Sequence, residues 1–204
     1  MSISPKYSSH VIGKGPIVID LYLDYVCPFS KKLYRTVYQQ VLPKVQEKYS
    51  DNVQFIFRHQ IQPWHPSSTL VHEAGIAVAQ LAPSKFWEFS YALFEELDSY
   101  NDESAYHLSR HEIYVKLSEL AEKSVGVDKN KFLELLTIAK DAKNSGNKVQ
   151  TDVKYFIKFG RQNGIHVSPS VTINGILDNS ISSSFTSEQW FEKFTSVIQE
   201  AGLQ

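Results

Sequence analysis

Cysteine is nearly absent from this chain of 204 residues: there is one, Cys27. A single cysteine excludes any disulfide within the chain, and with it the class of small extracellular domains that disulfides stabilise. The N-terminal residues 1–6 also lack the apolar segment of a secretory signal peptide. Together these absences predict a protein of a reducing compartment, the cytosol, and such a compartment includes the nucleus as well.

Long apolar runs and an excess of one charge are also missing. No stretch approaches the roughly 20 apolar residues that span a bilayer, and the net charge is -1. A nearly neutral chain has no electrostatic attraction to nucleic acid or to an anionic membrane. We therefore expect neither as a partner, and the sequence contains no indication of an oligomeric state.

Familiar metal and phosphate motifs are lacking too. His107 and His111 are four residues apart, but they lack the glutamate of a His-Glu-x-x-His zinc motif and lie on either side of the helix-capping Ser109. The segment 13–15, Gly-Lys-Gly, is too short and polar for a phosphate-binding loop. The sequence therefore predicts no metal and no tightly bound cofactor.

What is present is a globular composition, 42% hydrophobic and 13% aromatic, enough to bury a core. Residues 17–23 form a nearly continuous apolar run that suits a strand buried on both faces. From residue 28 onward apolar residues recur at helical spacing, and Pro43 is expected to kink or end that helix. Residues 53–58 alternate well enough for a second strand, which predicts a right-handed βαβ unit with parallel strands.

A helical block is expected at residues 66–146, after a loose polar entry segment at residues 1–15. Its third helix begins at a Ser109–Glu112 capping box, and its fourth is capped by Asp128 and continues to Ala139. The apolar stripes of these helices are typical of core seams in a helical subdomain.

The C-terminal part returns to mixed structure. A helix ending at Gly164 precedes a proline-entered strand, a hairpin turn at residues 174–175 (Asn-Gly), and a last helix capped by Thr186 with Gln189. Without the helical block, the order β-α-β then α-β-β-α is that of thioredoxin. We therefore predict an α/β thioredoxin fold formed by residues 17–65 and 147–204, with residues 66–146 inserted and residues 1–16 as a polar N-terminal segment.

Cys27 lies where the first strand gives way to the first helix, with Pro28 in the first turn. Unpaired N–H groups and the helix dipole at such a position favour a thiolate, as do Lys31 and Lys32 nearby. Ser30, one turn further, is positioned to donate a hydrogen bond to that thiolate. The alternative is that Cys27 merely packs, as buried cysteines often do.

Asp24 ends the strand before the thiol. Two readings stay open: a charge near the thiol that opposes thiolate formation or relays a proton, or a solvated loop carboxylate. His65 likewise either overlooks the thiol or is an exposed loop histidine.

Residues 24–33, Asp-Tyr-Val-Cys-Pro-Phe-Ser-Lys-Lys-Leu, resemble the active-site segment of DsbA-like thioredoxin-fold proteins. That segment runs acid, aromatic, Cys-Pro-aromatic-Cys and then a basic helix start. The resemblance continues at residues 65–66 (His-Pro), 85–89 (Lys-Phe-Trp-Glu-Phe) and 167–170 (Val-Ser-Pro-Ser), and it covers about residues 17–200. It implies a DsbA-like architecture, in which an all-helical insertion interrupts the thioredoxin domain.

By this resemblance Cys27, Ser30 and Pro169 would be the catalytic residues. Ser168 and Pro169 would form the cis-proline loop, a second wall of the site opposite the cysteine. The substrate-binding residues implied are Pro28, Phe29, Ser168 and Asp24. The alternative for Pro169 is an ordinary trans proline that enters an edge strand.

The departure is at Ser30, where the family has a second, resolving cysteine. Serine cannot expel a mixed disulfide, since its oxygen is not a thiolate at neutral pH. The first hypothesis is therefore a monothiol (CxxS) thiol–disulfide oxidoreductase that forms mixed disulfides with protein or small-molecule thiols, with glutathione as a possible co-substrate.

Two alternatives stay open. One is a glutathione-using enzyme resembling kappa-class glutathione transferases and hydroxychromene-carboxylate isomerases, which carry a serine where this chain has Cys27. The other is a non-catalytic thioredoxin-fold protein that binds a partner through the old substrate groove.

Overall fold

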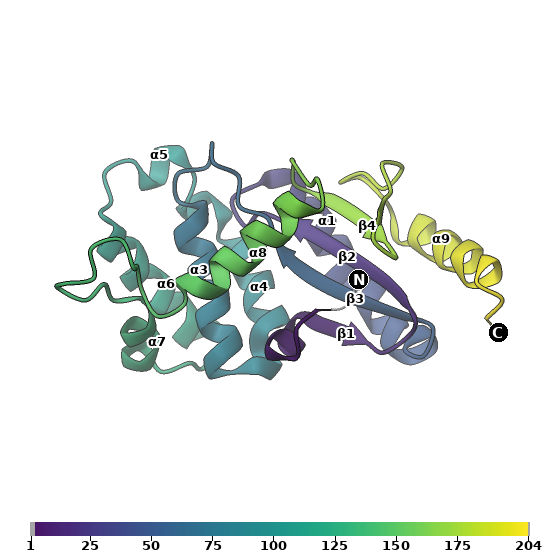
Figure 1. Ribbon diagram of the computed structural model, residues 1–204, viewed down its shortest axis with the longest axis horizontal. Coiled ribbons are helices and arrows are strands. Elements are labelled where there is room, and N and C mark those ends of the chain that lie inside the picture. The colour runs from purple at the N-terminus through teal and green to yellow at the C-terminus, as the bar shows by residue number, and fades with distance from the viewer. Residues whose placement is uncertain (1–2, 204) are drawn as a thin grey trace.

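The computed structural model describes residues 3–203. A mixed sheet lies beside a group of helices, and α8 crosses one face of the sheet (Figure 1). The strands are β1 (Val11–Gly13), β2 (Ile17–Leu23), β3 (Val53–His59), β4 (Ser170–Ile173) and β5 (Ile176–Leu177). The helices are α1 (Pro28–Thr36), α2 (Leu42–Lys44), α3 (Ser68–Leu81), α4 (Phe86–Glu95), α5 (Asp102–Ala105), α6 (Arg110–Val125), α7 (Lys129–Leu136), α8 (Gln150–Gln162) and α9 (Ser187–Glu200).

The strand order is β1-β3-β2-β4-β5. Strands β2 and β3 are parallel and joined through α1, which confirms the predicted βαβ unit. Strand β4 runs antiparallel to β2, and β5 runs antiparallel to β4. This is the thioredoxin arrangement with helices inserted between β3 and α8, so the predicted α/β fold is confirmed.

The N-terminal segment differs from the loose entry that the sequence predicts. Residues Pro5–His10 form a 3-10 helix, and β1 then pairs antiparallel with β3 at the edge of the sheet. Tyr7 is buried and its hydroxyl donates to Asp152 Oδ1 of α8 over 2.9 Å. The expectation of a loose segment is therefore wrong from residue 5 onward, while Met1 and Ser2 lie outside the described residues.

Pro43 does not end its helix, so the expected stop is wrong. Helical structure runs on through α2, with π-helical turns at Val37–Val41 and Val45–Tyr49 on either side. A π-turn is wider than an α-turn and leaves space for the proline ring, which would otherwise clash with the preceding turn. The predicted apolar seam therefore continues unbroken, and its members are fully buried: Leu33, Val37, Val41 and Val45.

The helical insertion follows its capping signals. Ser109 and Glu112 form a reciprocal capping box at the start of α6, and the Asp128 side chain caps α7. Helix α7 ends at Leu136, so the expected extension to Ala139 is wrong. In the C-terminal part, Thr186 caps α9 as predicted.

The β4–β5 hairpin has the predicted turn. Asn174 and Gly175 take positive φ angles of 51° and 83°, as a type I′ turn requires at both central positions. Asn174 Oδ1 also accepts a hydrogen bond from the Val18 N–H of β2. The turn is thereby tied to the neighbouring strand.

The two faces of the sheet are buried in different ways. On one face Phe55 of β3 packs against Trp190 and Phe194 of α9, with ring centroids 5.6 and 5.9 Å apart. On the other face lies an ion pair that the strand pattern did not predict. Arg58 Nε donates to Asp20 Oδ1 over 2.7 Å, and both side chains are buried.

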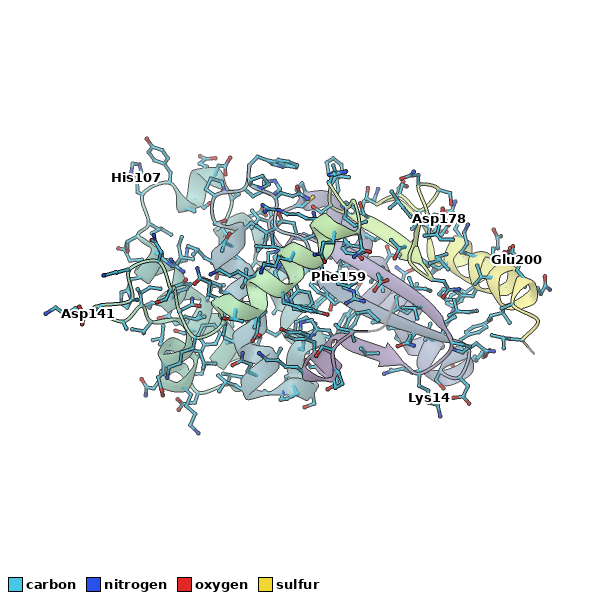
Figure 2. All side chains as sticks on the ribbon, in the orientation of Figure 1. Lys14, His107, Asp141, Phe159, Asp178 and Glu200 are labelled. Atoms are coloured by element: carbon cyan, nitrogen blue, oxygen red, sulfur yellow. The ribbon has the colours of Figure 1, made fainter. Side chains whose placement is uncertain are left out.

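Helix α8 covers this ion pair. The Phe159 ring, labelled in Figure 2, lies 4.3 Å from the Arg58 guanidinium carbon. Thr172 of β4 donates to the second oxygen of Asp20 over 3.0 Å. The two buried charges thus neutralise each other across β2 and β3, and a hydroxyl of β4 adds a hydrogen bond to the carboxylate.

A chain of buried histidines runs through the interface between the sheet and the helical insertion. His10 and His59 meet through their Nε2 atoms at 3.0 Å, and His59 and His72 meet through their Nδ1 atoms at 2.6 Å. The far nitrogen of His72 lies 3.6 Å from Asp24 Oδ1. Since one proton is shared in each contact between rings, His59 donates to one neighbour and accepts from the other.

This chain lies in apolar surroundings that oppose positive charge. Burial, and then the charge of Arg58, lower the pKa of His10 to about 3. Burial, with the charges of His72 and His10, also holds the pKa of His59 well below its usual value. Both rings are therefore neutral in the folded protein near neutral pH.

We expect stability to fall as the pH drops below the ordinary histidine pKa of 6.5. Below this pH the histidines bind protons in the unfolded chain but not in the folded chain. The contribution of the neutral histidines to the free energy of unfolding is therefore complete above pH 6.5 and is lost progressively below it. For His10 alone, the free energy of unfolding should be lower by about 2 kcal/mol at a pH near 5. Urea denaturation at a series of pH values measures it.

The matched variant is His10→Phe, because the ring packs between the aromatic rings of Phe86 and Phe156. It removes one titrating group, although it leaves the Nε2 atom of His59 without its partner and lowers stability at every pH. Its free energy of unfolding should therefore depend less steeply on pH below 6.5. An unchanged slope would show that His10 does not resist protonation.

Candidate active site

Cys27 is the N-cap of α1, directly after the turn that ends β2. Its thiol donates a hydrogen bond to the backbone carbonyl of Ser168, with 3.5 Å between Sγ and O. The Ser168–Pro169 peptide bond is cis. Two segments that are 141 residues apart in the sequence thus meet at the sulfur.

The turn before the helix is held by the backbone. The Cys27 N–H donates to the Asp24 carbonyl over 3.1 Å, and the Lys31 N–H donates to the Cys27 carbonyl over 3.0 Å. Pro28 occupies the first turn of α1, where a missing N–H leaves no bond unmade. Cys27 therefore lies at the start of the helix, where backbone N–H groups have no partner within the helix.

Asp24 organises the segment around the thiol from inside. The reading of a solvated loop carboxylate is wrong, since the side chain has 0% exposure. Its oxygens accept from the backbone N–H groups of Val26 and Gln62 and from the Ser68 hydroxyl, over 2.8 to 3.0 Å. His65 Nδ1 lies 2.9 Å from Oδ2.

These bonds keep Asp24 ionised. Burial alone would raise its pKa, but hydrogen bonds from His72, His65 and the Val26 N–H, with the charge of His72, lower the pKa to about 2. A carboxylate in this state accepts bonds and ties the strand end, the turn and α3 together. His65 is thereby only partly exposed, at 19% of its side chain, rather than an exposed loop residue.

Ser30 is fully buried, with 0% exposure. Its hydroxyl accepts a hydrogen bond from the Asp24 N–H over 3.3 Å. Among the residues the structure describes, this bond replaces the one that we expected between the hydroxyl and the thiol. Ser30 therefore stabilises the turn between β2 and α1 through this hydrogen bond.

The lysine that follows Ser30 has a partner away from the thiol. Lys31 Nζ donates to the Glu95 carbonyl at the end of α4, over 3.1 Å. Lys32 is exposed. The Lys31 side chain therefore joins α1 to α4, a contact that the sequence did not predict.

Three large apolar side chains are exposed on the segments that supply the site. Phe29, Trp64 and Val167 are 62%, 58% and 55% exposed, and each is a chain neighbour of a residue already described at the site. Cys27 itself keeps 5% exposure. Exposed apolar side chains that gather in one patch are typical of a surface that contacts a partner.

Sequence reasoning missed His72 and Ser68, which come from the first two turns of α3. The only signal was the resemblance at residues 65–66, which marks the loop but not the two side chains behind it.

His107 and His111 lie in the helical insertion, and the described residues contain no cluster of three or more groups able to hold a metal. None of the described helices is long and apolar enough to cross a membrane.

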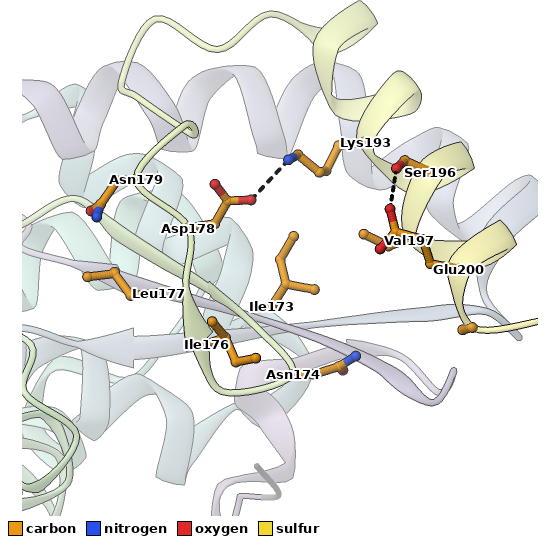
Figure 3. A pocket seen from close by; sticks show the side chains of 11 residues that line it. Ile173, Asn174, Ile176, Leu177, Asp178, Asn179, Lys193, Ser196, Val197 and Glu200 are labelled. Atoms are coloured by element: carbon orange, nitrogen blue, oxygen red, sulfur yellow. Dashed lines mark hydrogen bonds and ion pairs between the residues drawn. The ribbon is translucent and has the colours of Figure 1, made fainter.

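A hollow unconnected with the thiol lies between the β4–β5 hairpin and α9 (Figure 3). It has a volume of about 490 Å³, and an ion pair between Lys193 and Asp178, 3.0 Å long, crosses one side. It contains no cysteine or histidine. The cysteine and the buried Asp24 therefore make the thiol site, and not this hollow, the candidate active site.

Comparison with known proteins agrees with this geometry. A thioredoxin family model matches residues 7–197. Among curated protein sequences none matches the chain significantly.

Several solved structures share the fold. A candidate protein-disulfide isomerase from Pseudomonas syringae is 24% identical, with a TM-score of 0.74 over 93% of this chain and 99% of that one. BdbD from Bacillus subtilis is 20% identical, with a TM-score of 0.68 over 93% and 92%. MdbA, a thiol-disulfide oxidoreductase from Actinomyces oris, is 18% identical, with a TM-score of 0.65 over 93% and 86%.

The family model covers most of the chain, and the structural matches extend through the helical insertion as well as the sheet. The chain therefore belongs to the thioredoxin family, and its fold is the DsbA-like form, in which a helical subdomain interrupts the thioredoxin domain.

Proposed function

We propose that this protein is a monothiol thiol–disulfide oxidoreductase that forms mixed disulfides at Cys27. The observation that carries the proposal is the position of the thiol: at the start of α1, with 3.5 Å between its sulfur and the Ser168 carbonyl oxygen next to the cis proline. MdbA, which shares the fold, is described as a thiol-disulfide oxidoreductase.

The exchange needs two thiolates in turn. The Cys27 thiolate attacks one sulfur of an incoming disulfide; the new S–S bond forms as the old one breaks, and the other sulfur leaves as a thiolate. An external thiolate then attacks the substrate sulfur of this mixed disulfide and releases Cys27 as a thiolate. No net oxidant is required, because each step exchanges one S–S bond for another.

The second step distinguishes this chain from a dithiol enzyme. Ser30 occupies the place of a resolving cysteine, is fully buried, and already accepts a bond from Asp24. Its alcohol cannot displace a sulfur, so the mixed disulfide must wait for an outside thiol. In the predicted reducing compartment the glutathione pool would supply that thiol.

The remaining residues have supporting roles in this proposal. Asp24 holds the turn from inside, Pro28 begins the helix, and Phe29 offers an apolar contact at the rim. Ser168 and Pro169 form the opposite wall, where the Ser168 carbonyl accepts a hydrogen bond from the Cys27 thiol. That bond is lost when the thiolate forms and the proton passes from the sulfur to water. Glutathione is proposed as a co-substrate and not as a resident cofactor.

Oxidised glutathione should convert the protein to a stable adduct at Cys27. The expected product has the mass of the protein plus one glutathionyl group and persists until a reducing thiol is added, because no internal thiol can expel it. Intact mass spectrometry follows its formation, with Cys27→Ser as the unreactive control. Formation no faster than with a denatured sample would sink the proposal and favour a non-catalytic binding protein.

Restoring a thiol at residue 30 should change the fate of this adduct. In Ser30→Cys the new thiol lies one helical turn from Cys27 and should expel glutathione, which leaves an internal disulfide and a mass lower by two hydrogens. Mass spectrometry after the same treatment separates the two products.

The matched control is Ser30→Ala, which removes the hydroxyl without adding a thiol. It should keep the glutathione adduct, at a cost in stability of about 1–3 kcal/mol, because the Asp24 N–H loses its partner. If Ser30→Cys also keeps the adduct, then residue 30 does not occupy a resolving position.

A further inference from the structure

A second hollow, of about 390 Å³, opens beside the thiol site. It lies between the loop that joins β3 to α3 and the end of α8 with the loop that follows. Its volume is in the range of small-ligand sites, about 300–1,000 Å³. The lining residues fall into an apolar group and a polar group, which are described below.

Both walls of this hollow are attached to the thiol site. On one wall the Gln62 N–H donates to Asp24 Oδ2 over 3.0 Å. On the other wall His166 lies two residues before Ser168, whose carbonyl receives the Cys27 hydrogen bond. Two residues of chain span at most about 7 Å, so a ligand at Cys27 reaches the hollow within a few residues of its sulfur.

The apolar part comes from side chains of both walls. Ile61, Ile157 and Ile165 line it, together with Trp64, whose indole is 58% exposed. An exposed indole beside aliphatic side chains can cover an apolar side chain of a bound segment.

The charged side chain that lines the hollow is positive. Arg161 and the imidazole of His166 line it, and its lining contains no carboxylate. Arg161 is exposed at the last turn of α8, and it makes no ion pair with another described residue. An arginine presents several N–H donors in one plane and matches a carboxylate in two bonds.

A third observation points independently to a ligand. Gln62 lines the hollow with a side chain only 1% exposed, and within the described part of the chain its amide nitrogen has no hydrogen-bond partner. A buried donor without a partner is unfavourable. A carbonyl or carboxylate oxygen from a bound segment would satisfy it.

The hollow is held in shape without a ligand. Gln60 donates from its amide to the Ile165 carbonyl over 3.3 Å, and so joins the two walls. Gly160 of α8 makes this contact possible, because a Cβ atom there would lie 2.6 Å from Gln60 Oε1. A preformed site loses little conformational freedom on binding.

We infer that this hollow is a substrate subsite for a cysteine-containing polypeptide that carries an apolar side chain and a carboxylate near the reacting cysteine. The inference rests on the proposed exchange at Cys27. The apolar side chain packs on the isoleucines and Trp64, the carboxylate pairs with Arg161, and Gln62 donates to the segment. Glutathione has carboxylates but no apolar side chain, so it fills only part of the subsite.

The test uses short peptides with one cysteine activated as a 2-pyridyl disulfide. Cys27 attacks the peptide sulfur, the peptide stays on the protein, and the neutral thiopyridone that leaves is followed by its absorbance. The peptides carry a leucine next to the cysteine and differ only two residues away, where they have Glu, Gln or Lys. We expect the Glu peptide to react about threefold to tenfold faster than the Gln peptide, and the Lys peptide to be slowest.

Variants at residue 161 assign the preference to one side chain. Arg161→Gln should abolish the difference between the Glu and Gln peptides, and Arg161→Glu should make the Lys peptide the fastest. Lys158→Gln is the matched control, because it removes an exposed cation from the same helix but outside the hollow, and it should keep the full preference. Circular dichroism confirms that each variant is folded.

The outcomes separate this inference from the proposed function. Equal rates for the three peptides, or a preference that Arg161→Glu does not reverse, would overturn the subsite while leaving the exchange at Cys27 intact. The absence of any adduct, with the peptides as with oxidised glutathione, would overturn both.

Discussion

The carboxylate of Asp24 is the constraint on which the site depends. It is a buried charge, and it is tolerated because backbone and side-chain donors from the turn before Cys27, the loop after β3 and α3 converge on it. Those same bonds determine where the turn before Cys27 lies relative to the helical insertion. The thioredoxin domain and the insertion are therefore joined at Asp24, the residue that follows β2, and not only by apolar packing between their helices.

Behind this carboxylate lies a chain of histidine rings. His72 joins Asp24 to the histidines of β3 and of the N-terminal segment, with every ring in the core. On the far face of the sheet the charges of Arg58 and Asp20 cancel each other under α8. The interior thus separates two kinds of polar interaction, an ion pair under one helix and a chain of histidine rings next to the active-site turn.

Features set by local chemistry were predictable from the sequence. The capping boxes at Ser109 and Thr186, the turn at residues 174–175 and the apolar seam of α1 depend on neighbours a few residues away, and the structure contains all of them. The position of Cys27 at a helix start followed from the same reasoning. Pro43 is the local exception, since the rule that proline ends a helix does not anticipate a widened turn.

Features that need distant partners were not predictable. A polar segment before residue 16 reads as loose until Asp152 and the edge of β3 are known to lie beside it. Asp24 could not be assigned as buried without its donors on α3, and Lys31 reads as a neighbour of the thiol until Glu95 is placed. The N-terminal segment also links distant parts of the chain: Tyr7 reaches a partner 145 residues later, so this contact closes a long loop and forms only once α8 is in place.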